Sequence, residues 1–289
     1  MAVHRRGYQR YQGGLTGRWT RFLALPRFAW ARLLQQRLIL IALIVSLFFP
    51  LACAVFVYLA GHAELWGGLN PEFIRDVLRI DSRFFVTFME VQASFAIFLA
   101  ALAGPSLIAP DLANNALPLY LSRPLSRADY VLSRLLVLAG IISPVTWIPG
   151  LLLFGMQSGI AGWSWFAANW TIGLGLVAGF VLWIVLVGLV ALACSAYVKW
   201  RIVAGALVVA FFFVLAGAAQ IVRAVLRVDW VLMLNPFRSM DCVWRYFLGA
   251  DPWRQALPGP LACGLFLLFL GALFVWIIER KLRPVEVIS

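Results

Sequence analysis

The chain has 289 residues, of which 63% are hydrophobic and only 12% are charged. A soluble domain carries about 45–50% apolar and about 25% charged residues, so this composition excludes an ordinary water-facing surface and argues against a soluble enzyme. The formal net charge is nevertheless +12, which is typical of proteins that contact nucleic acid or an anionic membrane surface. The composition predicts an all-α, polytopic membrane protein.

The N-terminal 37 residues are strongly basic, with eight arginines and no acidic residue. Residues 1–17 are polar, and we expect a cytoplasmic tail there. From Arg18 to Arg37 apolar side chains recur at helical spacing, opposite several arginines. This pattern predicts an amphipathic interfacial helix before the first span, kinked or interrupted at Pro26.

Long apolar stretches follow, and a membrane-spanning helix needs about 20 such residues to cross about 30 Å of hydrocarbon. Six stretches meet this requirement and form one predicted membrane domain over residues 38–278, followed by a cytoplasmic tail at 279–289. The predicted spans are 38–60, 86–109, 135–157, 171–198, 202–222 and 255–278. Residues 158–169 contain tryptophans, so we expect the connection between the third and fourth spans there, at the membrane interface.

The basic residues lie on alternate connections. One side of the predicted topology carries sixteen Lys and Arg and four acids, whereas the other carries eight of each, so the whole charge of +12 falls on one face. Because positively charged loops stay in the cytoplasm, both termini are predicted to be cytoplasmic. The charge is therefore explained by the lipid bilayer, and no nucleic-acid partner is expected.

Enzymatic chemistry is not expected within this chain. The only lysines, Lys199 and Lys281, do not follow the glycine-rich loop of an ATP-binding P-loop. The only histidines, His4 and His62, cannot form a His-rich metal site or a haem ligand pair, and neither lies near a serine nucleophile motif. We expect no catalytic residue, no metal and no cofactor.

Glu90 is the one acidic residue predicted to lie at membrane depth. It is a candidate for an outer gate that lines a substrate exit. The alternative is an interfacial carboxylate that reaches headgroup water, and the position of Glu90 near the end of a span favours this second interpretation.

Gly175 and Gly179 are separated by three residues in the predicted fourth span. Such small-xxx-small pairs allow helices to approach closely. We interpret this pair as packing within the subunit.

The segment from Asp111 to Arg134 is the most structured sequence predicted on the cytoplasmic side. Gly104-Pro105 and Pro110 predict that the second span bends or ends there, and Asp111 is expected to cap a new short helix. Ser126 and Asp129 form a capping box before the third span. An apolar tip with flanking arginines lies between them and suits docking into another protein, although a simple positive-inside loop is the alternative.

This segment resembles the stretch between the second and third spans of ABC-2 type ABC transporter permeases. The family pattern is an acidic residue followed by L-x-x-S-x-P-[ILV]-S-R-x-x-[YF]. The chain matches it at Leu121, Ser122, Arg123, Pro124, Ser126, Arg127 and Tyr130. It departs at Ser133-Arg134, where the family often has Gly-Lys, and at Asn114-Asn115, where many members are more charged.

The resemblance implies a permease subunit of an ABC transporter, in a homodimer or heterodimer, with ATP hydrolysed by a separate ABC ATPase subunit. It also implies a location in the cytoplasmic (inner) membrane of a bacterium and export of a substrate that the sequence does not identify. The segment between the second and third spans would be the coupling helix that contacts the ATPase. The residues expected to shape this contact are Asp111, Leu121, Arg123, Pro124, Arg127 and Asp129. Two alternatives are a membrane anchoring or assembly protein with a cytoplasmic docking loop, and an ion-coupled carrier.

Overall fold

The protein is described by a computed structural model that covers residues 18–62, 79–114, 127–198, 200–250 and 258–282. All secondary structure in these residues is helical, and six helical segments are long and apolar enough to span a membrane. This confirms the predicted all-α class and the number of spans. The two ends of the chain, residues 1–17 and 283–289, lie outside the described residues. The prediction that both ends are cytoplasmic stays a prediction.

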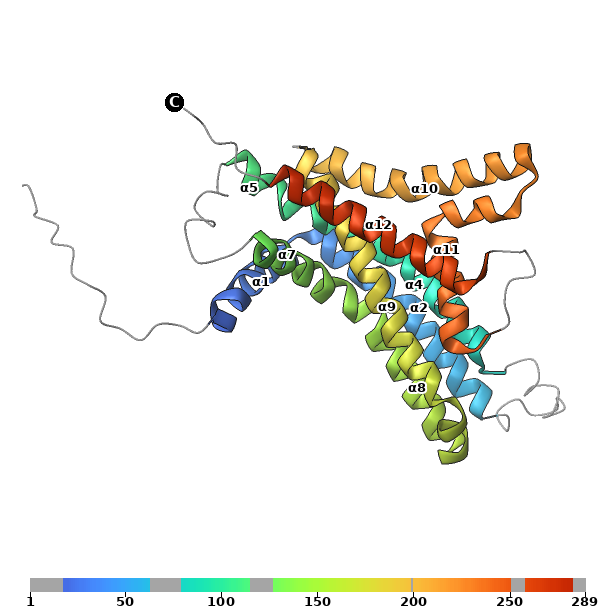
Figure 1. Cartoon of the computed structure of the whole chain (residues 1–289). Helices are drawn as coiled ribbons and strands as arrows, with labels where there is room; N and C mark the ends of the chain where they lie inside the picture. The colour runs from blue at the N-terminus through green and yellow to red at the C-terminus, as the bar shows by residue number, and fades with distance from the viewer. Residues whose placement is uncertain (1–17, 63–78, 115–126, 199, 251–257, 283–289) are drawn as a thin grey trace, which may run out of the picture.

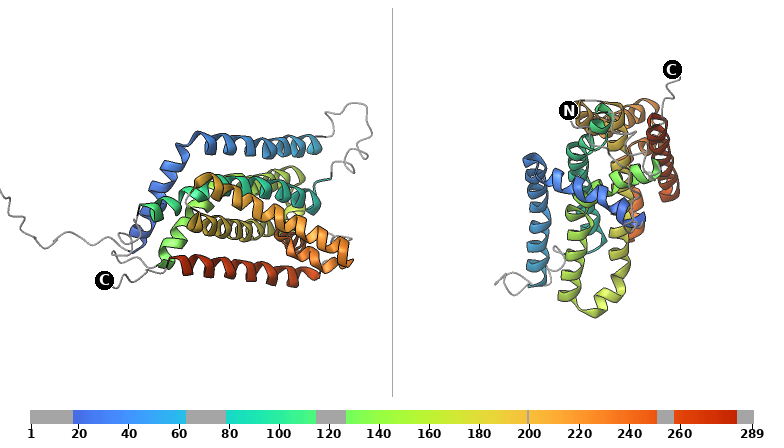
Figure 2. Two further views of the ribbon diagram at one scale, coloured as in Figure 1. Left: turned by 90° about the horizontal axis from the view of Figure 1, so that it is seen from above. Right: turned by 90° about the vertical axis from the view of Figure 1, so that its left-hand side faces the viewer.

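The first two helices form an angle at one end of the bundle. α1 (Arg18–Leu34) is a single helix that contains Pro26, so it is not interrupted there. α2 (Arg37–Gly61) is the first span, and only a narrow face of it is buried. Figure 2 shows α1 lying across the end of the bundle, transverse to the long helices. The interfacial position of α1 stays a prediction.

The second and third spans are both broken by a short 3₁₀ turn that contains proline. The second span consists of α4 (Ser82–Ala103), a turn at Gly104–Ser106 and α5 (Ala109–Ala113). The third consists of α7 (Arg127–Ile142), a turn at Ser143–Val145 and α8 (Trp147–Ala161). Proline has no N–H and its ring clashes with the preceding turn, which explains both breaks. The bend predicted at Gly104-Pro105 is confirmed.

The connection between the third and fourth spans differs from the prediction. Residues 158–169 are almost entirely helical, and the chain reverses at Gly162 alone, where φ is +86°. Glycine adopts this backbone conformation without a steric cost. The fourth span, α9 (Trp163–Tyr197), therefore begins eight residues before the predicted 171. Its first turns contain the tryptophans that were predicted to lie at the membrane interface.

The last part of the chain contains a helix that does not cross the bundle. The fifth span, α10 (Arg201–Leu226), leads into a 3₁₀ helix at Asp229–Leu234 and then into α11 (Pro236–Leu248). α11 packs against α9 and against the sixth span, α12 (Gly259–Lys281) (Figure 1). One face of α11, which includes Met240 and Trp244, is fully buried.

α9 forms the centre of the bundle. In its most apolar stretch 72% of the residues are buried, compared with 22% in each of α2, α10 and α12. Glycines on α9 allow the close approach of α11: a Cβ on Gly175 would lie 3.0 Å from the backbone oxygen of Phe247, and one on Gly179 would lie 2.6 Å from the Trp244 ring. The prediction that this glycine pair packs within the subunit is confirmed.

The close contact at Gly179 predicts a specific sensitivity. Gly179→Ala should lower stability by about 1–3 kcal/mol, because the new methyl group overlaps a fully buried indole. The matched control is Gly155→Ala on α8, where a Cβ meets nothing within 4 Å and better helix propensity should keep or raise stability. Thermal unfolding of the two variants in detergent measures the difference. Equal midpoints would contradict this packing.

Candidate functional site

The break in the second span is held against α9 by one serine. The hydroxyl of Ser195 accepts hydrogen bonds from the backbone N–H groups of Ile108 (3.2 Å) and Ala109 (3.0 Å). It also donates one to the carbonyl oxygen of Pro105 (3.3 Å). A hydroxyl has one donor and two acceptor positions, so all of them are used. The helix break leaves these backbone N–H and C=O groups without a partner in the helix. Ser195 supplies the partner inside the protein, as a membrane environment requires.

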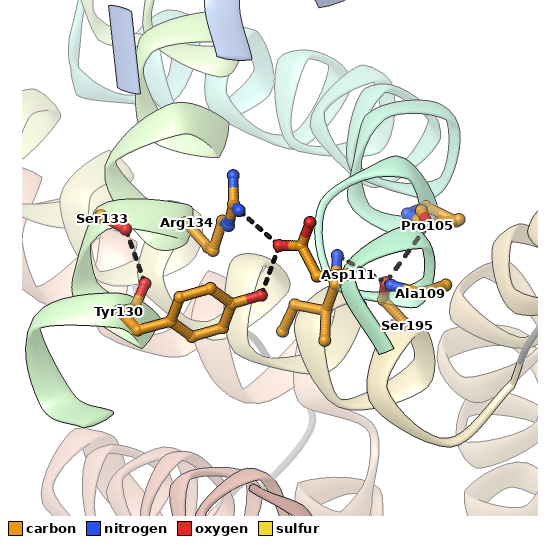
Figure 3. Close-up of polar contacts among 8 residues, drawn as sticks. Pro105, Ala109, Asp111, Tyr130, Ser133, Arg134 and Ser195 are labelled. Carbon is orange, nitrogen blue, oxygen red and sulfur yellow. Dashed lines mark hydrogen bonds and ion pairs between the residues drawn. The ribbon is translucent and has the colours of Figure 1, made fainter. Parts of the chain in front are cut away.

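Asp111 lies in the first turn of α5, just beyond this break. It was expected to cap the helix, but its carboxylate binds two side chains of α7 instead (Figure 3). Tyr130 Oη donates a hydrogen bond to Asp111 Oδ2 at 2.7 Å, and Arg134 Nη2 donates to the same oxygen in an ion pair. Tyr130 and Arg134 are four residues apart and therefore lie on the same face of α7.

The three side chains form a compact, charge-neutral cluster, which we call the Asp111 cluster. The side chains of Arg134 and Asp111 are 8% and 17% exposed, and Tyr130 is fully buried. The Arg134 guanidinium also lies 5.0 Å from the centroid of the Tyr130 ring, within the range of a cation–π contact. A buried charge is tolerated only when it is paired and hydrogen-bonded, so these residues depend on one another.

The Asp111 cluster joins the two ends of the segment that carries the sequence motif. Asp111 precedes residues 115–126 and belongs to the second span, whereas Tyr130 and Arg134 follow them and belong to the third. The spans on either side of this segment are therefore fixed to each other by a buried ion pair.

The structure describes only some of the other residues that were predicted to form the docking surface. Leu121, Arg123 and Pro124 lie outside the described residues, as does Ser126 of the capping box. Arg127 is the first residue of α7, and its side chain is also outside the described part. Asp129 is half-buried in the first turn of α7.

α1 is attached to α7 beside this cluster. Trp30 Nε1 donates a hydrogen bond to the carbonyl oxygen of Val137 at 2.9 Å. The indole occupies space next to Gly140, where a Cβ would lie 2.5 Å from the ring. The helix before the first span is therefore docked on the third span through one aromatic side chain.

A second polar cluster lies toward the opposite end of the bundle, around the predicted gate residue Glu90. Glu90 Oε1 pairs with Arg245 Nη2 at 3.2 Å, and Arg245 Nε pairs with both oxygens of Asp241 at 3.1 and 3.2 Å. Glu90 is eight residues into α4, about 12 Å along the helix from its start. Its side chain is 30% exposed and is held by a cation from α11, an arrangement that neither interpretation of Glu90 included.

The sequence interpretation missed the partners in both clusters. Arg134 was treated only as part of the predicted docking segment. Asp241 and Arg245 belong to the outer segment 223–254, which was expected to form short helices that dip into the membrane interface, without an assigned ion pair. A usable signal was present in the outer segment, because Asp241 and Arg245 are spaced i, i+4 and apolar residues recur at helical spacing around them. No comparable local signal links Asp111 to Arg134.

In comparisons with known proteins, no family model and no curated protein sequence matches this chain. The resemblance to ABC-2 type permeases therefore depends on the motif between the second and third spans and on the helical architecture.

The Asp111 cluster predicts non-additive effects of mutation. Arg134→Met should leave the Asp111 carboxylate buried without its cation and cost about 3–5 kcal/mol. Asp111→Asn should be destabilising for the converse reason. The double variant should recover a large part of the loss, because neither charge is left uncompensated. Thermal unfolding of the four proteins in detergent gives the coupling, and strictly additive losses would show that the two charges do not interact.

The cluster around Arg245 predicts a difference between buried and exposed ion pairs. Arg245→Ala should destabilise the protein strongly, because Glu90 and Asp241 would both lose their ion pair with Arg245 and the Asp241 side chain is only 4% exposed. Arg223→Ala is the matched control, since its pair with Asp229 has side chains that are 31% and 45% exposed. An exposed pair contributes about 0–1 kcal/mol. The test compares unfolding midpoints, and a control loss as large as that of Arg245→Ala would refute the assignment.

Proposed function

We propose that this chain is the permease subunit of an ABC-2 type transporter, which exports a substrate with energy from ATP hydrolysed by a separate ABC ATPase subunit. The observation that carries the proposal is the Asp111 cluster. It fixes together the two spans that flank the motif-bearing segment, and a segment that receives force from a motor must be attached in this way. The resemblance of the motif to ABC-2 type permeases is the reason for proposing this family.

In the proposed mechanism the ATPase binds the segment between Asp111 and Arg134 and moves it during the ATP cycle. Arg123 and Arg127 contact the ATPase, while Pro124, Leu121 and Asp129 set the shape of the docking surface. The movement reaches the second span through Asp111 and the third through Arg134. Ser195 then passes it to α9, because its hydroxyl is bonded to the break between α4 and α5.

The proposed topology places both termini, α1, α5 and the start of α7 on the cytoplasmic side of a bacterial inner membrane. Support comes from the arrangement in Figure 1, where α1, α5, the start of α7 and the end of α12 lie toward the same end of the bundle. In the part of the chain that the structure describes, these elements carry basic residues of the predicted cytoplasmic side, namely Arg32, Arg134, Arg280 and Lys281. α1 lies at the interface of the inner leaflet in this topology.

The functional unit proposed is a dimer of permease subunits, homomeric or heteromeric, with two ATPase domains. In this proposal the substrate path is formed between the two subunits. The chain itself is then not an enzyme.

A test of the proposal is co-purification from native membranes. The tagged full-length chain, extracted in a mild detergent, should carry a protein with P-loop and other ATP-binding cassette motifs, identified by mass spectrometry. The double variant Arg123→Glu/Arg127→Glu should reach the membrane in normal amounts and lose this ATPase, because two charges at the docking surface are reversed. Substrate export by cells should be lost in parallel.

The control is Arg223→Glu/Arg227→Glu, which makes the same charge change at the opposite end of the bundle, at the end of α10. It should retain the ATPase. Absence of any ATPase from the wild-type preparation, or equal retention by the two double variants, would contradict the proposal. A different cytoplasmic protein lost in its place would support the anchoring or assembly alternative instead.

A further inference from the structure

A cleft opens at the end of the bundle where α1 lies, between α1, α5, α7 and the start of α10. Its volume is about 280 Å³. Three of its walls each carry an arginine, Arg32 on α1, Arg134 on α7 and Arg201 on α10. Among the described residues that line it, the only carboxylate is Asp111, which binds Arg134. The cleft therefore has an excess of positive charge that comes from Arg32 and Arg201.

Arg32 and Arg201 are exposed and can reach a ligand in this cleft. Arg201 Nη2 donates a hydrogen bond to Gln36 Oε1 at 2.8 Å, which holds its guanidinium against the link between α1 and α2. Neither arginine forms an ion pair with a carboxylate within the described ranges. The planar guanidinium group presents paired N–H donors that match the oxygens of a phosphate.

Exposed apolar side chains line the cleft or lie close to its lining residues in the chain. Phe28 lines the cleft and is 76% exposed, and Trp200, next to Arg201 in the chain, is also 76% exposed. Leu38, in the first turn of α2, is 69% exposed. A soluble anion would need none of this apolar surface, whereas a lipid would place its phosphate at the arginines and its acyl chains along these side chains. Basic pockets between membrane helices recognise lipid headgroups in this way.

We propose that this cleft binds the headgroup phosphate of an anionic phospholipid from the adjacent leaflet. Arg32 and Arg201 hold the phosphate between them, so the bound lipid joins α1 to the start of α10. This inference does not depend on the proposed transport function. It requires only that the chain spans a membrane.

The test uses the full-length chain in nanodiscs of phosphatidylcholine with phosphatidylglycerol as the anionic probe. Lipids that remain bound after transfer to detergent are counted by native mass spectrometry. The wild type should retain phosphatidylglycerol in preference to phosphatidylcholine. Arg32→Ala/Arg201→Ala should weaken phosphatidylglycerol binding by about tenfold or more, because each basic residue near the membrane surface contributes to lipid attraction.

The matched control is Arg27→Ala/Arg37→Ala, which removes two exposed arginines of α1 and α2 that do not line the cleft. It should retain the lipid as the wild type does. An equal loss in both double variants would mean only a diffuse attraction to the basic end and would overturn the proposal. The alternative is a soluble-anion site. It would be identified if inorganic phosphate bound to the protein in phosphatidylcholine nanodiscs, if this binding required Arg32 and Arg201, and if the protein showed no preference for phosphatidylglycerol.

A second measurement avoids dependence on the variants. A photoactivatable phosphatidylglycerol with its reactive group near the headgroup should label wild-type peptides that contain Phe28 or Arg201. Labelling confined to other parts of the chain, or cross-linking of an acidic protein to these peptides in native membranes, would refute the lipid site.

Discussion

The close packing of helices on α9 is the constraint on which the rest of the structure depends. α4, α7, α8, α10, α11 and α12 all contact it. Helices in lipid gain little from hydrophobic burial and associate through van der Waals contact, which requires small residues where backbones approach. α9 supplies these at Gly175, Gly179 and Gly188, each of which faces a side chain or backbone of another helix within 3 Å of an added Cβ. The helices that carry the Asp111 cluster and the cluster around Arg245 all pack on α9, so α9 determines where the two clusters lie.

The second span carries an acidic residue toward each of its ends, and each is bound by an arginine from another part of the chain. Asp111 is paired with Arg134 of the third span, and Glu90 is paired with Arg245 of α11. Between them, Gln92 Nε2 donates to the Ser46 carbonyl at 3.1 Å, and Trp183 Nε1 donates to the Ala93 carbonyl at 3.1 Å. The second span is therefore held by directional contacts near each of its two ends.

The architecture was predictable from the sequence where it depends on interactions within one segment of the chain. Hydropathy identifies six spans because lipid forces each crossing segment to satisfy its own backbone hydrogen bonds. Gly104-Pro105 predicts a bend because proline cannot continue the helical bonding pattern. The turn at Gly162 was misplaced because tryptophans mark the interface and do not determine where a helix ends. Arg134 and Arg245 were not predicted as partners of Asp111 and Glu90, because these pairs are separated by 23 and 155 residues and depend on how the helices pack.

The single-residue turn at Gly162 has a consequence for how the bundle can deform. With one residue between α8 and α9, a change in the angle between them must be absorbed by the backbone dihedrals of Gly162 and its immediate neighbours. The close packing of α8 on α9 opposes such a change and favours movement of the two helices together as a hairpin. The 3₁₀ turn at Ser143–Val145 is then the point at which α7 can change direction relative to that hairpin. The third span thus consists of a half that is paired with α9 in a tight hairpin and a half, next to the motif, that is held by α9, α1 and the Asp111 cluster.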